Sequence, residues 1–65
     1  MKKLIILSNN NKEYVVNNPE NFLNHLKKYH SKKGKGDNSI HEENGYYFTV
    51  TNDFYKSIVD WFDKL

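Results

Sequence analysis

Five lysines lie between residues 27 and 35, in the stretch KKYHSKKGKGD, and they are the residues best suited to bind an anion. Each ammonium group acts as a point charge that neutralises a phosphate or a carboxylate. Three interpretations of the stretch compete. The first is a solvated helix end followed by a flexible loop, and the others are a contact with an acidic protein surface and a contact with a nucleic-acid backbone. The candidate binding lysines are Lys27, Lys28, Lys32, Lys33 and Lys35.

Three features limit what these lysines can recognise in a nucleic acid. All ten basic residues are lysine, so the chain lacks the arginine that usually reads guanine edges and stacks on bases. Tyr29 lies among the lysines, but its place in the helical pattern predicts that its ring points into the core. The acidic second helix would also repel phosphate wherever it adjoins the lysines. Any binding to nucleic acid should therefore be weak and directed at the backbone.

The residues that most often carry catalysis or bind metals are poorly placed in the sequence. His25 and His30 lie five positions apart, about 140° around a helix, and His41 belongs to another element, so we expect no metal site. Glu42 and Glu43 are adjacent, and they alternate across a strand instead of forming a carboxylate pair. The glycines of GKGDNS do not have the spacing of a phosphate-binding loop. We therefore expect no catalytic residue, no cofactor and no enzymatic activity.

The first half of the chain predicts a hairpin followed by a helix. Residues 2–8 and 12–17 are rich in β-branched and apolar side chains, and the asparagines between them favour a turn. Asn18 is a good helix cap, and Pro19 suits the first helical position. Leu23, Leu26, Phe22 and Tyr29 then form one apolar stripe. The helix is predicted over residues 19–33, with Gly34 ending it.

The second half predicts another hairpin and another helix. In the hairpin, a three-residue turn of Glu43, Asn44 and Gly45 would pair Glu42 with Tyr46. This register is favoured over a two-residue turn of Asn44 and Gly45 because it groups the apolar side chains on one face, which are Ile40, Tyr46, Phe48 and Val50. The opposite face then carries His41, Tyr47 and Thr49. Thr51 or Asn52 caps the last helix, whose apolar stripe is Phe54, Ile58, Trp61, Phe62 and Leu65.

The element order ββαββα predicts a single α+β domain over residues 1–65. Its simplest form is a four-stranded, mainly antiparallel sheet with both helices packed on one face. Two helices cover only one face of so small a sheet, so apolar side chains on the other face should stay partly exposed. In the first strand these are either Ile5 and Leu7 or Leu4 and Ile6. They are accompanied by Tyr14 or Val15 and by Tyr47. Such a face predicts a protein partner or a homodimer. Tyr47 is therefore a sixth candidate binding residue.

Composition and charge indicate the compartment of the protein and the kind of partner that it attracts. The chain has no cysteine, and the apolar run of MKKLIIL is too short for a signal peptide or a membrane span, so we expect a cytoplasmic protein without a membrane contact. Residues 1–36 hold eight lysines and two acids, whereas residues 37–65 hold two lysines and six acids. This asymmetry gives the molecule a preferred side for anionic partners.

These features together favour a small, non-enzymatic protein that binds another protein. The many asparagines and lysines and the lack of arginine suggest AT-rich coding, as in phages or mobile genetic elements. An accessory protein that inhibits or regulates a host nucleic-acid-handling enzyme fits this description. The alternative is a weak, sequence-nonspecific binder of nucleic acid or another polyanion that uses residues 27–35.

Overall fold

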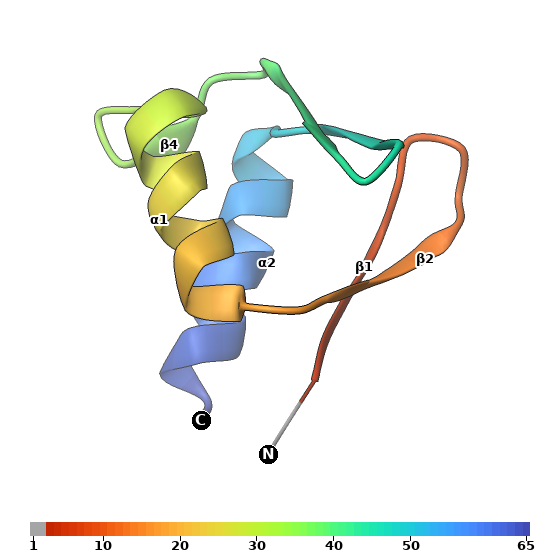
Figure 1. Cartoon of the computed structure of the whole chain (residues 1–65). Helices are drawn as coiled ribbons and strands as arrows, with labels where there is room; N and C mark the ends of the chain where they lie inside the picture. The colour runs from red at the N-terminus through yellow and green to blue at the C-terminus, as the bar shows by residue number, and fades with distance from the viewer. Residues whose placement is uncertain (1–2) are drawn as a thin grey trace.

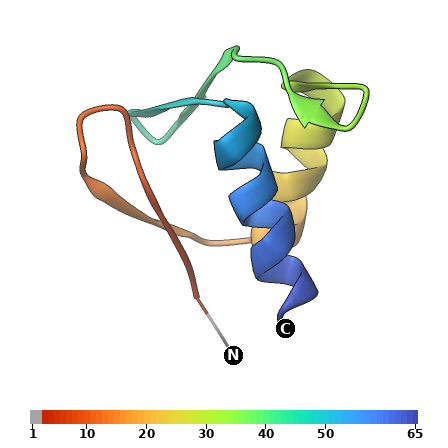
Figure 2. The same cartoon turned by 180° about the vertical axis from the view of Figure 1, so that it is seen from behind.

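The computed structural model describes residues 3–65, which form an α+β fold with two helices and antiparallel strands. Lys2, the predicted first residue of the first strand, lies outside the described residues. The two helices lie side by side, and the first and last hairpins lie together on one side of them (Figures 1 and 2). The elements are β1 (Leu4–Leu7), β2 (Glu13–Val16), α1 (Pro19–Tyr29), β3 (Ser31–Lys32), β4 (Lys35–Gly36), β5 (Ile40–Glu43), β6 (Tyr46–Thr49) and α2 (Asn52–Asp63).

Both helices begin where the sequence predicts. The side chain of Asn18 accepts a hydrogen bond from the backbone N–H of Asn21, and Pro19 opens α1. Thr51 caps α2 in the same way, since its hydroxyl accepts from the backbone N–H of Phe54. These bonds satisfy donors that a helix start leaves without an intrahelical partner.

The predicted four-stranded sheet is wrong, because the strands form three separate antiparallel pairs, β1–β2, β3–β4 and β5–β6. Asn9 shows why the first and last pairs do not merge. Its backbone N–H donates to the carbonyl of Tyr47 (2.7 Å), and its side-chain carbonyl accepts from the backbone N–H of Thr49 (3.0 Å). Asn9 belongs to the turn after β1, so the two hairpins meet at a corner instead of along a shared strand edge.

The predicted register of β5–β6 is also wrong. Glu43 pairs with Tyr46 and His41 pairs with Phe48, so Asn44 and Gly45 form a two-residue turn. Both turn residues have positive φ, 53° and 84°, which is the backbone that this tight hairpin turn requires. The register buries His41 and Phe48 and leaves Ile40 exposed. Phe48 in the core and Tyr47 on the open face agree with the sequence prediction, whereas a buried Ile40 does not.

Helix α1 is shorter than predicted, because the chain leaves it at His30 to form the hairpin β3–β4. The backbone of His30 has φ −128° and ψ 17°, outside the helical region, although its N–H still reaches the carbonyl of Leu26 (2.8 Å). Lys33 (φ 54°) and Gly34 (φ 78°) make the turn between the two short strands. Gly36 packs so tightly that a Cβ there would lie 2.4 Å from the carbonyl oxygen of Thr51.

The core lies between the two helices and the inner faces of the first and last hairpins. Tyr55 contributes to it although the sequence pattern did not single it out, while Leu65, placed on the predicted stripe, is exposed. No helix among residues 3–65 is both long and apolar enough to cross a membrane. The buried apolar residues are Leu4, Ile6, Tyr14, Val16, Phe22, Leu23, Leu26, Phe48, Val50, Tyr55 and Ile58.

Candidate functional site

The five candidate lysines all lie at one end of α1 and are exposed, as the sequence analysis expected. Lys27 and Lys28 occupy the last turn of α1, and the other three lie on or between β3 and β4. The expected flexible loop is instead a hydrogen-bonded hairpin, in which Lys32 pairs with Lys35. The backbone of Asp37 also donates to the carbonyl of His30 (3.0 Å), which holds the base of the hairpin against the end of α1. We call residues 31–36 the lysine hairpin.

Tyr29 does not point into the core. Its side chain is 58% exposed, and the ammonium nitrogen of Lys28 lies 5.3 Å from the centre of its ring. The helix ends at Tyr29, so no following turn of α1 covers the ring. An exposed aromatic ring therefore accompanies the lysines, and this removes one of the arguments against nucleic acid.

The outer face of the β1–β2 hairpin is apolar and exposed. Burial alternates along both strands, with Leu4, Ile6, Tyr14 and Val16 inward and the residues between them outward. Ile5 pairs directly with Val15, and Leu7 pairs with Glu13. We call Ile5, Leu7 and Val15 the outer hairpin face. The predicted exposed apolar face is thus present on this hairpin.

Tyr47 lies away from the lysine hairpin, so the structure does not bring all six candidate binding residues together. Its backbone meets Asn9 at the corner between the two hairpins, and its side chain is 56% exposed. Ile40, which the predicted register placed in the core, is exposed on β5. Exposed apolar side chains therefore occur on both of the larger hairpins.

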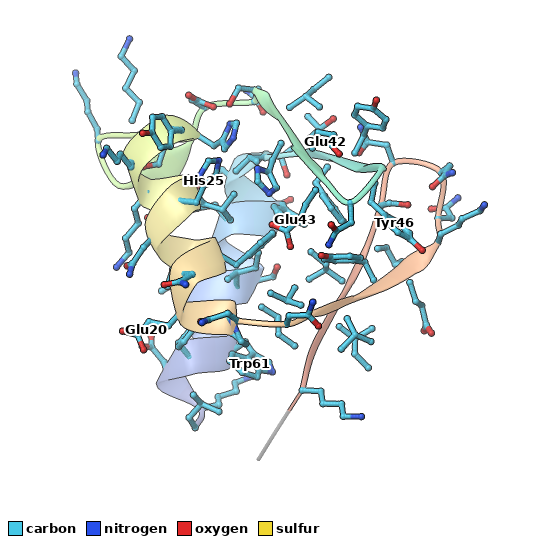
Figure 3. All side chains as sticks on the ribbon, in the orientation of Figure 1. Glu20, His25, Glu42, Glu43, Tyr46 and Trp61 are labelled. Carbon is cyan, nitrogen blue, oxygen red and sulfur yellow. The ribbon has the colours of Figure 1, made fainter. Side chains whose placement is uncertain are left out.

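Three histidines that the sequence analysis set apart converge in the structure. Each of His25, His30 and His41 offers a ring nitrogen, and these atoms all lie within 4.8 Å of one another. His25 lies on the side of α1 that faces the β5–β6 hairpin, opposite Glu43 (Figure 3). The expected rotation of about 140° between His25 and His30 does not apply, because His30 is not helical. The shift in register then turned His41 inward.

Carboxylates and hydroxyls surround this histidine cluster. The Nε2 of His41 lies 3.1 Å from Oε1 of Glu43, and the hydroxyl of Tyr14 donates to the other oxygen of the same carboxylate (2.6 Å). On the other side, Nδ1 of His30 lies 2.6 Å from the hydroxyl of Ser39, which in turn donates to Asp37. Hydrogen bonds from Ser39 lower the pKa of Asp37, so this carboxyl stays ionised and keeps accepting.

The electrostatics of the cluster favour the neutral form of His25 and His30. Desolvation lowers the pKa of His25 and of His30, and the neighbouring His41 lowers both further. Burial and the hydrogen bond to Glu43 raise the pKa of Tyr14, so that its hydroxyl keeps its proton. Neutral imidazoles with free lone pairs are suited to binding a metal or accepting a proton. No sequence pattern pointed to the cluster, because its members come from three segments.

The chain matches no protein-family model, and no curated protein or solved structure matches it either.

Proposed function

We propose that this protein is a small binding protein that acts by covering a surface of another protein. The exposed outer hairpin face is the observation that carries the proposal. Ile5, Leu7 and Val15 are each about half exposed, at 51%, 57% and 46%. A domain of this size has few apolar side chains to place outside its core, and a cluster of them on one hairpin is typical of an interaction site.

Charge supports a partner with an acidic surface. The outer hairpin face, α1 and the lysine hairpin all belong to the half of the chain that holds eight lysines and two acids. Enzymes that cut or copy nucleic acids carry clustered carboxylates for their metal ions. An inhibitor or regulator of such a host enzyme, encoded by a phage or mobile element, is the role that we propose.

The experiment compares wild-type protein with Leu7→Lys/Val15→Lys as baits in lysate of the native host. Both substitutions are on exposed positions, so the domain should still fold, which circular dichroism checks. A specific partner should be retained by wild type and by the control Asn24→Lys, which adds a lysine to the exposed side of α1, and lost from the double variant. Capture of the same proteins by all three baits would contradict the proposal.

A homodimer is the competing occupant of the outer hairpin face. Sedimentation distinguishes a homodimer from a complex with a different protein. A homodimer should dissociate on dilution, and Leu7→Lys/Val15→Lys should abolish it. A wild-type monomer at all concentrations, together with a captured partner, supports binding of a different protein.

A second candidate function is weak binding of nucleic acid or another polyanion, which the exposure of Tyr29 beside the lysines favours. Base stacking on a single aromatic ring is worth about 1–3 kcal/mol, and it tolerates any base. The log–log dependence of affinity on salt should have a slope of about −0.7 per phosphate contact on single strands and about −0.9 on duplex DNA.

A matched pair of variants tests this second function. Replacing Lys32, Lys33 and Lys35 with glutamine should lower the salt slope by about one contact per lysine, whereas the same change at Lys12, Lys56 and Lys64 should leave it unchanged. Equal effects of the two triple variants would mean that net charge alone attracts the nucleic acid. No saturable binding by wild type at low salt would exclude the function.

A further inference from the structure

The histidine cluster has the composition of a metal site. The ring centres of its members lie 5.3 Å (His25–His30), 4.7 Å (His25–His41) and 5.2 Å (His30–His41) apart. The rings therefore surround one point from three segments: α1, the residue after it, and β5. Nearby aromatic rings, Tyr29 and Phe22 among them, pack against the outside of the cluster.

The hydrogen bond made by His30 determines which of its nitrogens is free. The hydroxyl of Ser39 has one proton, and it donates this proton to Asp37. Ser39 must therefore accept in its contact with Nδ1 of His30, so Nδ1 carries the proton. The lone pair of His30 is then on Nε2.

The hydrogen bond made by His41 works in the same way with the nitrogens exchanged. A carboxylate can only accept, so Nε2 of His41 donates to Glu43 and the lone pair is on Nδ1. Histidines that bind metals usually donate their other N–H to a carboxylate, hydroxyl or carbonyl that holds the ring in place. Both His41, which is buried, and His30, which is partly buried, have such a partner.

We propose that His25, His30 and His41 together bind one divalent late transition-metal ion of the zinc class. Imidazole suits zinc, copper, nickel and cobalt, whereas magnesium and calcium prefer oxygen ligands. Ligand nitrogens at about 2.0–2.1 Å from a tetrahedral zinc lie about 3.3 Å apart. The histidine nitrogens lie within 4.8 Å of one another, so each distance between two of them must shorten by about 1.5 Å or less. His25 is exposed, so its side chain can rotate toward the other two rings.

A pocket next to the cluster leaves room for a further ligand. Its volume is about 370 Å³, and its lining includes two of the three histidines: Asn17, Asn18, Asn21, Phe22, His25, His41 and Glu43. Three protein ligands with an open position are typical of zinc sites that bind water or a substrate. Water or a side chain of a partner protein could reach a fourth position through this pocket.

The test is a calorimetric titration of chelator-treated protein with zinc sulfate. We expect saturation at one zinc per chain and no heat of binding with magnesium sulfate. His25→Gln removes an exposed ligand, so the variant should fold and bind zinc at least tenfold more weakly. Asn24→Ala, the adjacent exposed position, should bind like wild type. No saturable zinc binding, or equal affinity in His25→Gln, would overturn the proposal.

Two further measurements distinguish a built site from casual binding to histidines. Ser39→Ala keeps all three ligands and removes the partner of His30, so it should weaken zinc binding by about 10–100-fold. Two-bond ¹H–¹⁵N spectra of the zinc-bound protein should assign the metal to Nε2 of His30 and to Nδ1 of His41. The opposite nitrogens, or unchanged affinity in Ser39→Ala, would contradict the assigned geometry.

Discussion

Phe48 and Ile40 illustrate how much a single residue depends on strand register. A three-residue turn places both on one face, whereas the observed two-residue turn leaves Phe48 1% exposed and Ile40 59% exposed. Phe48 contacts the rings of Tyr14, Phe22 and Phe54 from three different elements. Its side chain therefore joins the hairpins to both helices.

Phe48→Ala should lower the free energy of unfolding by about 3–5 kcal/mol, because it leaves a cavity at the centre of the core. Ile40→Ala is the control, and it should change stability by less than about 0.5 kcal/mol since its side chain is exposed. Urea denaturation followed by circular dichroism measures both. Similar losses from the two variants would favour the register that buries Ile40.

The histidines predict a pH dependence of stability in the presence of a chelator. The folded state lowers the pKa of His25 and of His30 below the ordinary 6.5, so the unfolded chain binds more protons in this range. Stability should therefore fall as pH falls through about 6.5 towards the lower pKa values of the folded state. His41 faces both rings, Glu43 faces His25 and Asp37 faces His30, so these charges modulate the effect.

Urea midpoints measured at pH 7.5 and at pH 5.5 with chelator present check this expectation, because most carboxylates are still ionised over that interval. The double variant His25→Gln/His30→Gln should show a smaller difference between the two midpoints. A higher urea midpoint at pH 5.5 than at pH 7.5 in the wild-type protein would contradict the expectation.

At the scale of elements, the sequence predicted the features that depend on neighbours along the chain. Asn18, Pro19 and Thr51 act within a single turn, so both helix starts could be read from the residues. The existence of the β1–β2 and β5–β6 hairpins was also predictable from runs of β-branched and aromatic residues and from asparagine-containing turns. The lysines could be chosen as candidates because exposure follows directly from their charge.

Features that depend on distant contacts could not be predicted. The end of α1 is determined by the lysine hairpin, whose position depends on Gly36 lying against the backbone of Val50 and Thr51. The register of β5–β6 depends on His41 packing against Phe22, which lies on α1. The histidine cluster requires both outcomes at once. The spacing of the histidines in the sequence therefore could not predict it.

Gly36→Ala tests how firmly the lysine hairpin is attached to the start of α2. The added Cβ would lie 2.4 Å from the carbonyl oxygen of Thr51 and 2.5 Å from that of Val50. Relief requires a backbone shift, and overpacking of this kind costs about 1–3 kcal/mol. Amide exchange of residues 31–36 should become faster as the hairpin separates from α2, and the urea midpoint should fall.

Gly34→Asn is the matched control on the same hairpin. A Cβ at Gly34 meets nothing within 4 Å, and asparagine tolerates the positive φ of 78° better than other side chains. Exchange rates in this variant should stay close to those of wild type. Faster exchange in Gly34→Asn than in Gly36→Ala would mean that the turn, not the packing of Gly36, holds the hairpin.

At the scale of the whole molecule, metal binding should act on the global stability of a domain that has a small core. A ligand that binds only the folded state raises the free energy of unfolding by about 2.7 kcal/mol when its free concentration is 100 times its dissociation constant. For a domain of this size each kcal/mol of added stability raises Tm by about 4–8 °C. Zinc at that concentration should therefore raise Tm by about 10–20 °C. Thermal unfolding with and without zinc measures the shift, which chelator should reverse.

His25→Gln provides the control for that experiment. It should show a rise in Tm about half as large as that of wild type, or smaller, because binding at least tenfold weaker adds about 1.4 kcal/mol or less at the same zinc concentration. A rise in Tm that is equal in wild type and in this variant would show that zinc stabilises the molecule through other residues.

The division of the strands into three separate pairs also bears on how fast the chain can fold. Every strand pairs with its neighbour in sequence, so each ladder closes only a short loop. The contacts of Asn9 with Tyr47 and Thr49, which join distant segments, are made by the turn after β1 and not by a ladder between strands. Chains with mostly local pairing reach their transition state at little entropic cost, and they refold in microseconds to milliseconds. Stopped-flow dilution from urea should therefore find refolding complete, or nearly so, within the mixing time.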